Sequence, residues 1–237
     1  MLLFFSTAYA DKTSIVLGVV PLYSAAETLE IWAPFAVYAE NGQMRVIIRT
    51  ERSTQDFESG LLSGKYDMAF MTARQHEKAK ARYKAAAVPF EKTMRGAVIV
   101  RRDSGINSLK DLNQKQIAFA SPDEYISSVV MRRILSEHGI EFMPVYLNSV
   151  SSVIIGTENQ LYPAGSVLGG FYEYSESLKS IFVTEEYASY VVGFSPRVSK
   201  EEKEHLTKAL LGMHNSKTAR STINKLGITS FVLPEKK

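Results

Sequence analysis

The segment Ile15-Val-Leu-Gly-Val-Val-Pro-Leu-Tyr-Ser-Ala-Ala-Glu27 spans one complete strand-to-helix transition. Its first six residues are apolar, which is typical of a strand buried on both faces of a sheet. Pro21 ends the strand, and Ser24 with Glu27 has the form of a capping box, which satisfies the first free amides of a helix. Apolar residues then recur at helical spacing until Asn41-Gly42, where we expect this helix to end.

The same alternation of strands and helices continues along the chain. Strands that each lead into a helix predict parallel βαβ units, and hence the α/β class. A charged break follows the apolar strand Ala97–Val100, so we expect two lobes. Further strands are expected over residues 44–50, 66–71, 116–120, 145–147 and 180–184, and helices from Ser53, Arg74, Ser121, Ser149, Ser199 and Thr218.

The composition excludes several kinds of site. The chain has 237 residues, 45% of them apolar, and no cysteine, so disulfides, thiolate metal sites and cysteine nucleophiles are excluded. The four histidines are far apart, so we expect no metal ion, and we expect no cofactor. A net charge of +3 spread along the chain does not indicate nucleic-acid binding.

No motif of a common enzyme class is present in the sequence. It lacks the Gly-x-Ser-x-Gly elbow of serine hydrolases, the phosphate-binding P-loop and the Gly-x-Gly-x-x-Gly dinucleotide fingerprint. The acids Glu185 and Glu186 are adjacent, which is typical of a solvated surface rather than of a catalytic pair. We therefore expect a binding protein and not an enzyme.

The N-terminus has the pattern of the end of an export signal. Residues 1–10 are largely apolar and finish with Ala8-Tyr9-Ala10, the small-x-small pattern of a secretory cleavage site. We therefore expect cleavage after Ala10 and a periplasmic location. A buried N-terminal strand is the alternative, since the basic residues that usually open a signal peptide are absent.

Five segments, in the right order, resemble one family of binding proteins. The closest match is Gly64-Lys-Tyr-Asp-Met-Ala-Phe-Met71, which contains the third expected strand. The family is that of the substrate-binding proteins of phosphate, phosphite and phosphonate ABC importers. The other four segments are Gly18–Ala25, Arg95–Ser104, Ser108–Phe119 and Leu226–Phe231.

This resemblance implies a two-lobed periplasmic-binding fold of type II. Each lobe is expected to be a mostly parallel sheet flanked by helices, with the ligand between the lobes. The resemblance places a hinge near Val100 to Arg102 and a return crossing near Tyr187 to Val191. The first lobe then comprises residues 11–101 and 191–237, the second lobe comprises residues 102–190, and residues 1–10 are the remnant of the signal peptide.

The resemblance also implies a function and partners. A monomeric chain would bind a small oxyanion, such as a phosphonate, phosphite or phosphate, and deliver it to the membrane permease of an ABC importer. A membrane sensor is the alternative partner. The loops Thr72–Arg74 and Ser149–Ser151 depart from the family's pattern, so a sulfonate or a carboxylate is the alternative ligand.

The candidate ligand-binding residues follow the strands. In α/β sheets, ligands bind beyond the carboxyl ends of strands, where helix N-termini face them. Several hydroxyl groups lie there, together with Arg74, whose guanidinium suits bidentate pairing with an oxyanion. The candidates are Tyr23, Ser24, Thr72, Arg74, Ser121, Tyr125, Ser127, Ser128 and Ser149.

Each candidate also has a purely structural alternative. Ser24 could be a plain helix cap, Arg74 a solvated surface residue, and the serines between residues 121 and 128 part of an ordinary capped helix. Asp123 and Glu124 would moreover oppose a dianionic ligand at that helix.

Overall fold

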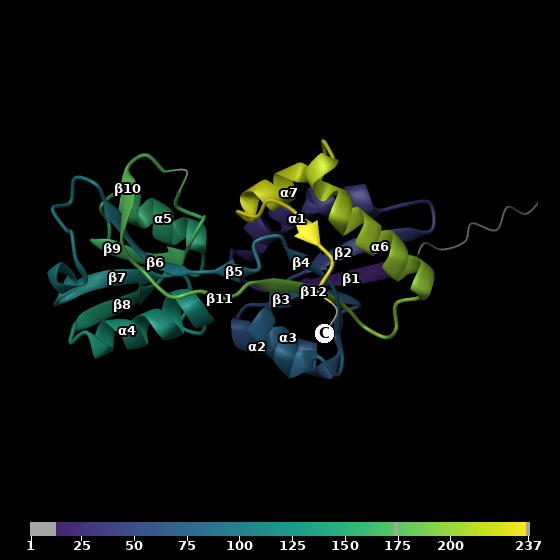
Figure 1. The fold of residues 1–237 in the computed structure, drawn as a ribbon, viewed down its shortest axis with the longest axis horizontal. Helices are drawn as coiled ribbons and strands as arrows, with labels where there is room; N and C mark the ends of the chain where they lie inside the picture. The colour runs from purple at the N-terminus through teal and green to yellow at the C-terminus, as the bar shows by residue number, and fades with distance from the viewer. Residues whose placement is uncertain (1–12, 174, 236–237) are drawn as a thin grey trace, which may run out of the picture.

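The computed structural model describes residues 13–173 and 175–235, which form two lobes joined by two crossings of the chain (Figure 1). The sheet of the first lobe has the strand order β13-β4-β12-β3-β1-β2. Its strands are β1 (Thr13–Val19), β2 (Met44–Arg49), β3 (Met68–Thr72), β4 (Lys84–Pro89), β12 (Tyr190–Phe194) and β13 (Phe231–Val232). Its helices are α1 (Ala25–Ala39), α6 (Lys200–Gly212) and α7 (Arg220–Lys225) on one face, and α2 (Thr54–Ser63) and α3 (Ala73–Ala79) on the other.

The second lobe has a five-stranded sheet of order β10-β6-β9-β7-β8. Its strands are β6 (Gly96–Arg101), β7 (Lys115–Phe119), β8 (Phe142–Tyr146), β9 (Ala164–Leu168) and β10 (Leu178–Val183). One face is covered by α5 (Val150–Glu158), and the other by a π-helix (Tyr125–Val130) that continues into α4 (Met131–Glu137). Short 3-10 turns lie at Leu109–Leu112 in this lobe and at Met213–Asn215 in the first.

Both sheets are mixed rather than mostly parallel. Strands of βαβ units pair in parallel, as β1 does with β2 and β3, and β7 with β8 and β9. In contrast, β12 is antiparallel to β3 and β4, and β6 is antiparallel to β9 and β10. Both β6 and β12 enter their sheets directly from a crossing, so no crossover helix sets them parallel to their neighbours.

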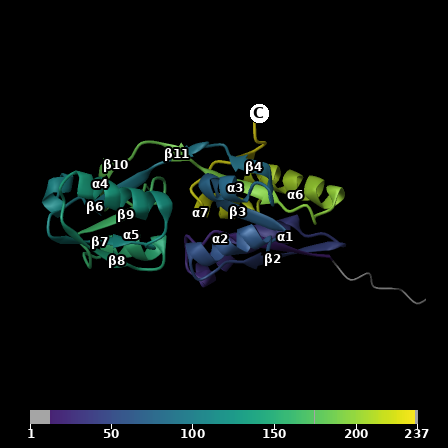
Figure 2. The same ribbon diagram turned by 90° about the horizontal axis from the view of Figure 1, so that it is seen from below.

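Two short strands connect the lobes, as Figure 2 also shows. They are β5 (Thr93–Met94) and β11 (Tyr187–Ala188), and they pair with each other in an antiparallel manner. The expected hinge near Val100 to Arg102 is wrong by one strand, because β6 already belongs to the second sheet. An apolar strand suits the interior of either sheet, so its composition could not assign it. Residues 1–10, the expected signal-peptide remnant, lie outside the described residues.

Tyr66 explains why the motif at Gly64–Met71 belongs to the scaffold. Its side chain is fully buried and stacks on Phe57 with ring centroids 5.3 Å apart. A Cβ atom added at Gly18 would lie 2.4 Å from the Tyr66 ring, and one at Gly60 would lie 2.5 Å from its hydroxyl. Only glycines leave room for this ring between β1 and α2.

Asp67 ties three segments of the first lobe together. Its carboxylate accepts a hydrogen bond from the Val16 amide at 3.0 Å and pairs with Arg197, whose Nη2 lies 2.9 Å away. Arg197 precedes α6, so this contact holds the C-terminal part of the chain against β1 and β3. The motif therefore builds the fold and does not line the ligand site.

We expect Gly18→Ala to destabilise the protein, because the new methyl group would overlap the buried ring of Tyr66. Overpacking of this kind costs about 1–3 kcal/mol. Urea denaturation followed by circular dichroism measures the change in the transition midpoint. The control is Gly42→Ala, where an added Cβ meets no atom within 4 Å. Equal midpoints for the two variants would contradict this account of the motif.

Candidate functional site

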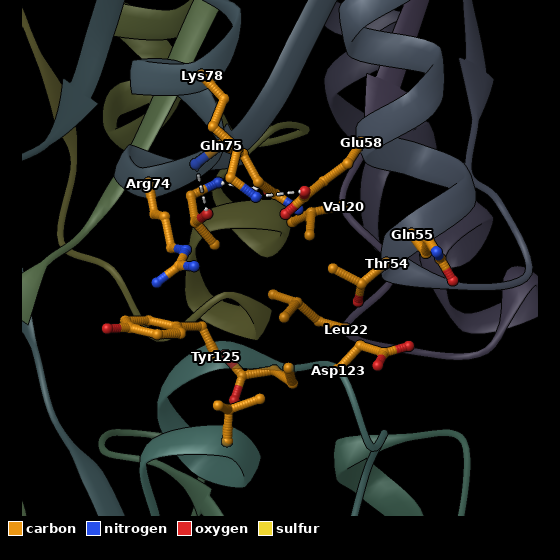
Figure 3. Close-up of a pocket in the computed structure, with 13 residues that line it drawn as sticks. Val20, Leu22, Thr54, Gln55, Glu58, Arg74, Gln75, Lys78, Asp123 and Tyr125 are labelled. Atoms are coloured by element: carbon orange, nitrogen blue, oxygen red, sulfur yellow. Dashed lines mark hydrogen bonds and ion pairs between the residues drawn. The ribbon is translucent and has the colours of Figure 1, made fainter.

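Two neighbouring cavities lie in the cleft between the lobes. The smaller one has a volume of about 310 Å³ and is bordered by α2 and α3 of the first lobe and by residues 123–125 of the second (Figure 3). The larger one, of about 720 Å³, lies beside the N-termini of α1 and α2. Thr54 and Asp123 border both cavities, so these are adjoining parts of one cleft.

Arg74 is placed in the smaller cavity by the start of α3. Thr72 and Gln75 form a capping box there, with the Gln75 amide donating to Thr72 Oγ1 at 3.2 Å. The Arg74 guanidinium lies over the ring of Tyr125 in the second lobe, with its Cζ 4.1 Å from the ring centroid. Among residues 13–173 and 175–235, the Arg74 guanidinium has no ion pair or hydrogen bond. The N–H donors of the guanidinium therefore remain available to a ligand, while the Tyr125 ring packs against one face of the guanidinium plane.

The other charges beside this cavity are already paired. Lys78 Nζ lies 2.6 Å from the Glu58 carboxylate, so these two side chains neutralise each other. Arg74 is therefore the one cation of the smaller cavity, within the described residues, that has no acidic partner.

Glu124 caps the π-helix in the place expected of Ser121. The helix begins at Tyr125, so the expected helix start at Ser121 is wrong. The Glu124 carboxylate accepts hydrogen bonds from the amides of Ile126 and Ser127 and from Ser127 Oγ, the last at 2.6 Å. Burial raises the pKa of Glu124, although these hydrogen bonds partly offset the effect.

Glu27 joins the two lobes at the far side of the cleft. Its carboxylate accepts from the Ser24 amide within its own capping box and from Ser149 Oγ of the second lobe, both at 3.0 Å. Nearby, the Val150 amide donates to the Leu22 carbonyl at 3.2 Å, again across the lobes. Burial acts to raise the pKa of Glu27, but hydrogen bonds from Ser24, Ser151 and Ser149 outweigh it, and the pKa lies below its ordinary value.

The structure brings six of the nine candidate residues to the cleft and buries the other three. Ser127 and Ser128 are buried within the second lobe, where the Ser127 carbonyl accepts from Ser166. Ser149 is also buried, as the cap of α5 and the partner of Glu27. The residues that border a cavity are Tyr23, Ser24, Thr72, Arg74, Ser121 and Tyr125.

Among these six residues, Tyr23 has a largely structural role, because its ring and its hydroxyl both contact other parts of the protein. Its ring meets Phe171 of the second lobe edge to face at 5.9 Å, and its hydroxyl donates to the Lys225 carbonyl at 3.0 Å. Burial raises the pKa of Tyr23, and the charge of Glu27 raises it further.

Sequence reasoning missed the roles of Glu27, Lys78 and Glu58. Glu27 has the position of an ordinary capping-box acid, and nothing in its spacing indicates a partner 122 residues away. Lys78 and Glu58 meet only because α2 and α3 pack side by side.

We expect Glu27→Gln to lower the free energy of unfolding at neutral pH by about 1 kcal/mol, because a charged acceptor shared by both lobes is lost at a partly exposed site. The folded pKa of Glu27 is depressed, so its contribution is present above the unfolded value of about 4.3 and lost as the pH falls through the folded value. Urea denaturation of both proteins from about pH 7 to about pH 3 should show the difference shrink.

The matched control is Glu202→Gln. Glu202 forms the same kind of capping box with Ser199 at the start of α6, with a 2.9 Å hydrogen bond from the Ser199 amide. Within the part of the chain that the structure describes, the Glu202 side chain forms no hydrogen bond beyond the capping box. If both variants lost the same stability at every pH, the contact between Glu27 and Ser149 would contribute nothing.

Comparison with known proteins gives the family. The model of the phosphonate ABC transporter periplasmic substrate-binding protein family matches residues 17–237. No curated protein sequence matches the chain.

Solved structures show the fold. PhnD1 of Prochlorococcus marinus, in complex with methylphosphonate, is 15% identical with a TM-score of 0.76, over 94% of this chain and 93% of that one. A binding-protein component of an ABC phosphonate transporter from Pseudomonas aeruginosa is 15% identical with a TM-score of 0.73, over 94% and 82%. A Xanthomonas citri protein bound to chloride ion is 18% identical with a TM-score of 0.66, over 94% and 92%.

These similarities confirm the type II periplasmic-binding fold, with sheets flanked by helices in two lobes. Because the family model covers nearly the whole sequence, the chain belongs to the periplasmic substrate-binding proteins of phosphonate ABC transporters.

Proposed function

We propose that this solute-binding protein holds a small oxyanion-bearing ligand in the interlobe cleft and that Arg74 pairs with the oxyanion. The observation that carries the proposal is the Arg74 guanidinium, which borders the cavity without an acidic partner among the described residues. A guanidinium presents paired N–H donors that match the geometry of a phosphonate, phosphate, sulfonate or carboxylate group.

The place of Arg74 between the lobes suits a binding protein that closes on its ligand. Arg74 belongs to the first lobe, and Tyr125, on which it lies, belongs to the second. A ligand that contacts both residues binds the closed arrangement better than an open one, and this difference in affinity shifts the protein toward closure. The smaller cavity, of about 310 Å³, is of the size that small-molecule ligands occupy.

Membership of the family supports a proposal for the partner and the location. The family acts with membrane permeases of ABC transporters, and we propose such a permease as the partner of the closed form. We also propose that the chain acts as a periplasmic monomer and that export removes residues 1–10 by cleavage after Ala10, which mass spectrometry of the secreted protein would show. In the described part of the chain, no helix combines the length and apolar character needed to span a bilayer.

We expect Arg74→Ala to weaken binding of the preferred anion about 10- to 100-fold, since a hydrogen bond to a charged group contributes about 1.5–3 kcal/mol. A thermal-shift screen of phosphonates, phosphite, phosphate, sulfonates and small carboxylates first identifies that anion. A ligand at about one hundred times its Kd adds about 2.7 kcal/mol of stability. Isothermal titration calorimetry then compares the native and variant proteins.

The control variant is Arg82→Ala. Arg82 is exposed, follows α3 in the first lobe and borders neither cavity of the cleft. It carries the same charge as Arg74, so it reports any general effect of net charge. If no anion raised the melting temperature, the proposal of an oxyanion ligand would fail. Equal affinities in the two variants would remove Arg74 from the site.

A further inference from the structure

Two hydrogen bonds join the lobes on the side of the cleft where α1 and α5 begin. The Glu27 carboxylate, in the first turn of α1, accepts from Ser149 Oγ at 3.0 Å, and Ser149 is the N-cap of α5. At the next residue of the second lobe, the Val150 amide donates to the Leu22 carbonyl at 3.2 Å. Each bond runs from one lobe to the other, and we call this pair of bonds the interlobe latch.

Apolar side chains surround the interlobe latch. Tyr23 of the first lobe meets Phe171 of the second lobe edge to face, with ring centroids 5.9 Å apart. Both rings border a third cavity, of about 310 Å³, which Glu27 and Val150 also border. Apolar surroundings lower the local dielectric, so a hydrogen bond to a carboxylate is stronger here than in open water.

The bond between Glu27 and Ser149 lies beside the ligand cleft but outside its two cavities. Ser24 and Asn148, close to these residues in the sequence, border the larger cavity from opposite lobes, whereas Glu27 and Ser149 border neither cavity. The lobes are joined by the two crossings that contain β5 and β11 (Figure 2). A rotation about these crossings that widened the larger cavity would separate Glu27 from Ser149. The interlobe latch therefore forms in the closed arrangement and is lost in an open one.

Comparison with Glu202 separates this contact from helix capping. Glu27 and Glu202 complete equivalent capping boxes at α1 and α6, with hydrogen bonds from the amides of Ser24 and Ser199 at 3.0 and 2.9 Å. Of these two acids, Glu27 alone also bonds to the other lobe within the described residues. The bond from Ser149 is thus not part of the capping box, and it is free to break when the lobes separate.

We propose that Glu27 is a positioning residue for closure, which favours the closed lobes before a solute binds and thereby raises the affinity for every solute of the cleft. The effect on affinity rests on the proposed function, whereas the effect on the ligand-free protein does not. A solute that requires the closed form binds with an apparent Kd equal to its intrinsic Kd divided by the closed fraction. A contact that favours closure therefore strengthens binding without touching the solute.

Small-angle X-ray scattering of the ligand-free full chain tests the proposal directly. We expect Glu27→Ala to increase the radius of gyration relative to the native protein, because the open form becomes more populated. The matched control is Glu202→Ala, which loses an equivalent capping box and should keep the native radius. Equal radii of gyration in the two ligand-free variants would overturn the proposal.

Isothermal titration calorimetry with methylphosphonate, phosphite and methanesulfonate provides the second measurement. Loss of a hydrogen bond to a charged group should change the closing equilibrium about tenfold at this partly exposed site. We therefore expect Glu27→Ala to weaken every anion that binds by the same factor, about two- to fivefold, while Glu202→Ala binds as the native protein does. A loss confined to one anion would contradict an effect through closure.

A double-mutant cycle shows whether Glu27 acts through Ser149. Because the two residues share one bond across the lobes, Glu27→Ala combined with Ser149→Ala should weaken binding no more than Glu27→Ala alone. Ser199→Ala, which removes a serine cap of α6 far from the cleft cavities, controls for the loss of a helix cap. Additive losses in the double variant would remove Ser149 from the proposal.

The two measurements separate this inference from the proposed function. If none of the anions bound the native protein, the proposed function would fail, while the scattering comparison would still decide whether Glu27 favours closure. If the anions bound, but Glu27→Ala and Glu202→Ala had equal affinities and equal radii of gyration, the role of Glu27 in closure would be wrong and oxyanion binding would remain.

Discussion

The arrangement of the cleft depends on the pairing of β12 between β3 and β4. This strand follows the second crossing, and its register places Tyr190 opposite Thr72, the cap of α3. The Ala73 amide donates to the Ser189 carbonyl at 2.8 Å, so the crossing is attached at the residue before Arg74. The crossing that returns from the second lobe is thereby anchored beside the turn at Thr72–Arg74, which positions the guanidinium.

The lobes also meet through side chains whose sequence positions are far apart. Glu27 reaches Ser149, Arg74 covers Tyr125, and the Tyr23 ring meets Phe171. Each of these contacts uses a residue near the end of a strand or the start of a helix, where the alternation of strands and helices concentrates polar side chains. The same edge that a ligand would occupy therefore also supplies the contacts between the lobes.

Much of the fold was predictable because its signals are local. The capping boxes at Ser24 and Ser199 and the caps at Ser53 and Ser149 start helices where their spacing predicted. The exception is Ser121, which does not cap the helix expected there. The longer side chain of Glu124 accepts from the free amides instead, and the helix begins at Tyr125. The seven expected strands overlap β1, β2, β3, β6, β7, β8 and β10, because short runs rich in apolar residues suit a sheet.

By itself, the sequence determined the α/β class and the two-lobed family, because these depend on residue periodicity and on short motifs along the chain. It also indicated which strand ends hold polar groups. Only the tertiary structure decided which sheet contains β6, that Ser127 and Ser128 lie inside the second lobe, and that Glu27 pairs across the cleft. Those outcomes depend on strand register and on contacts between distant segments, which the spacing of residues along the chain does not encode.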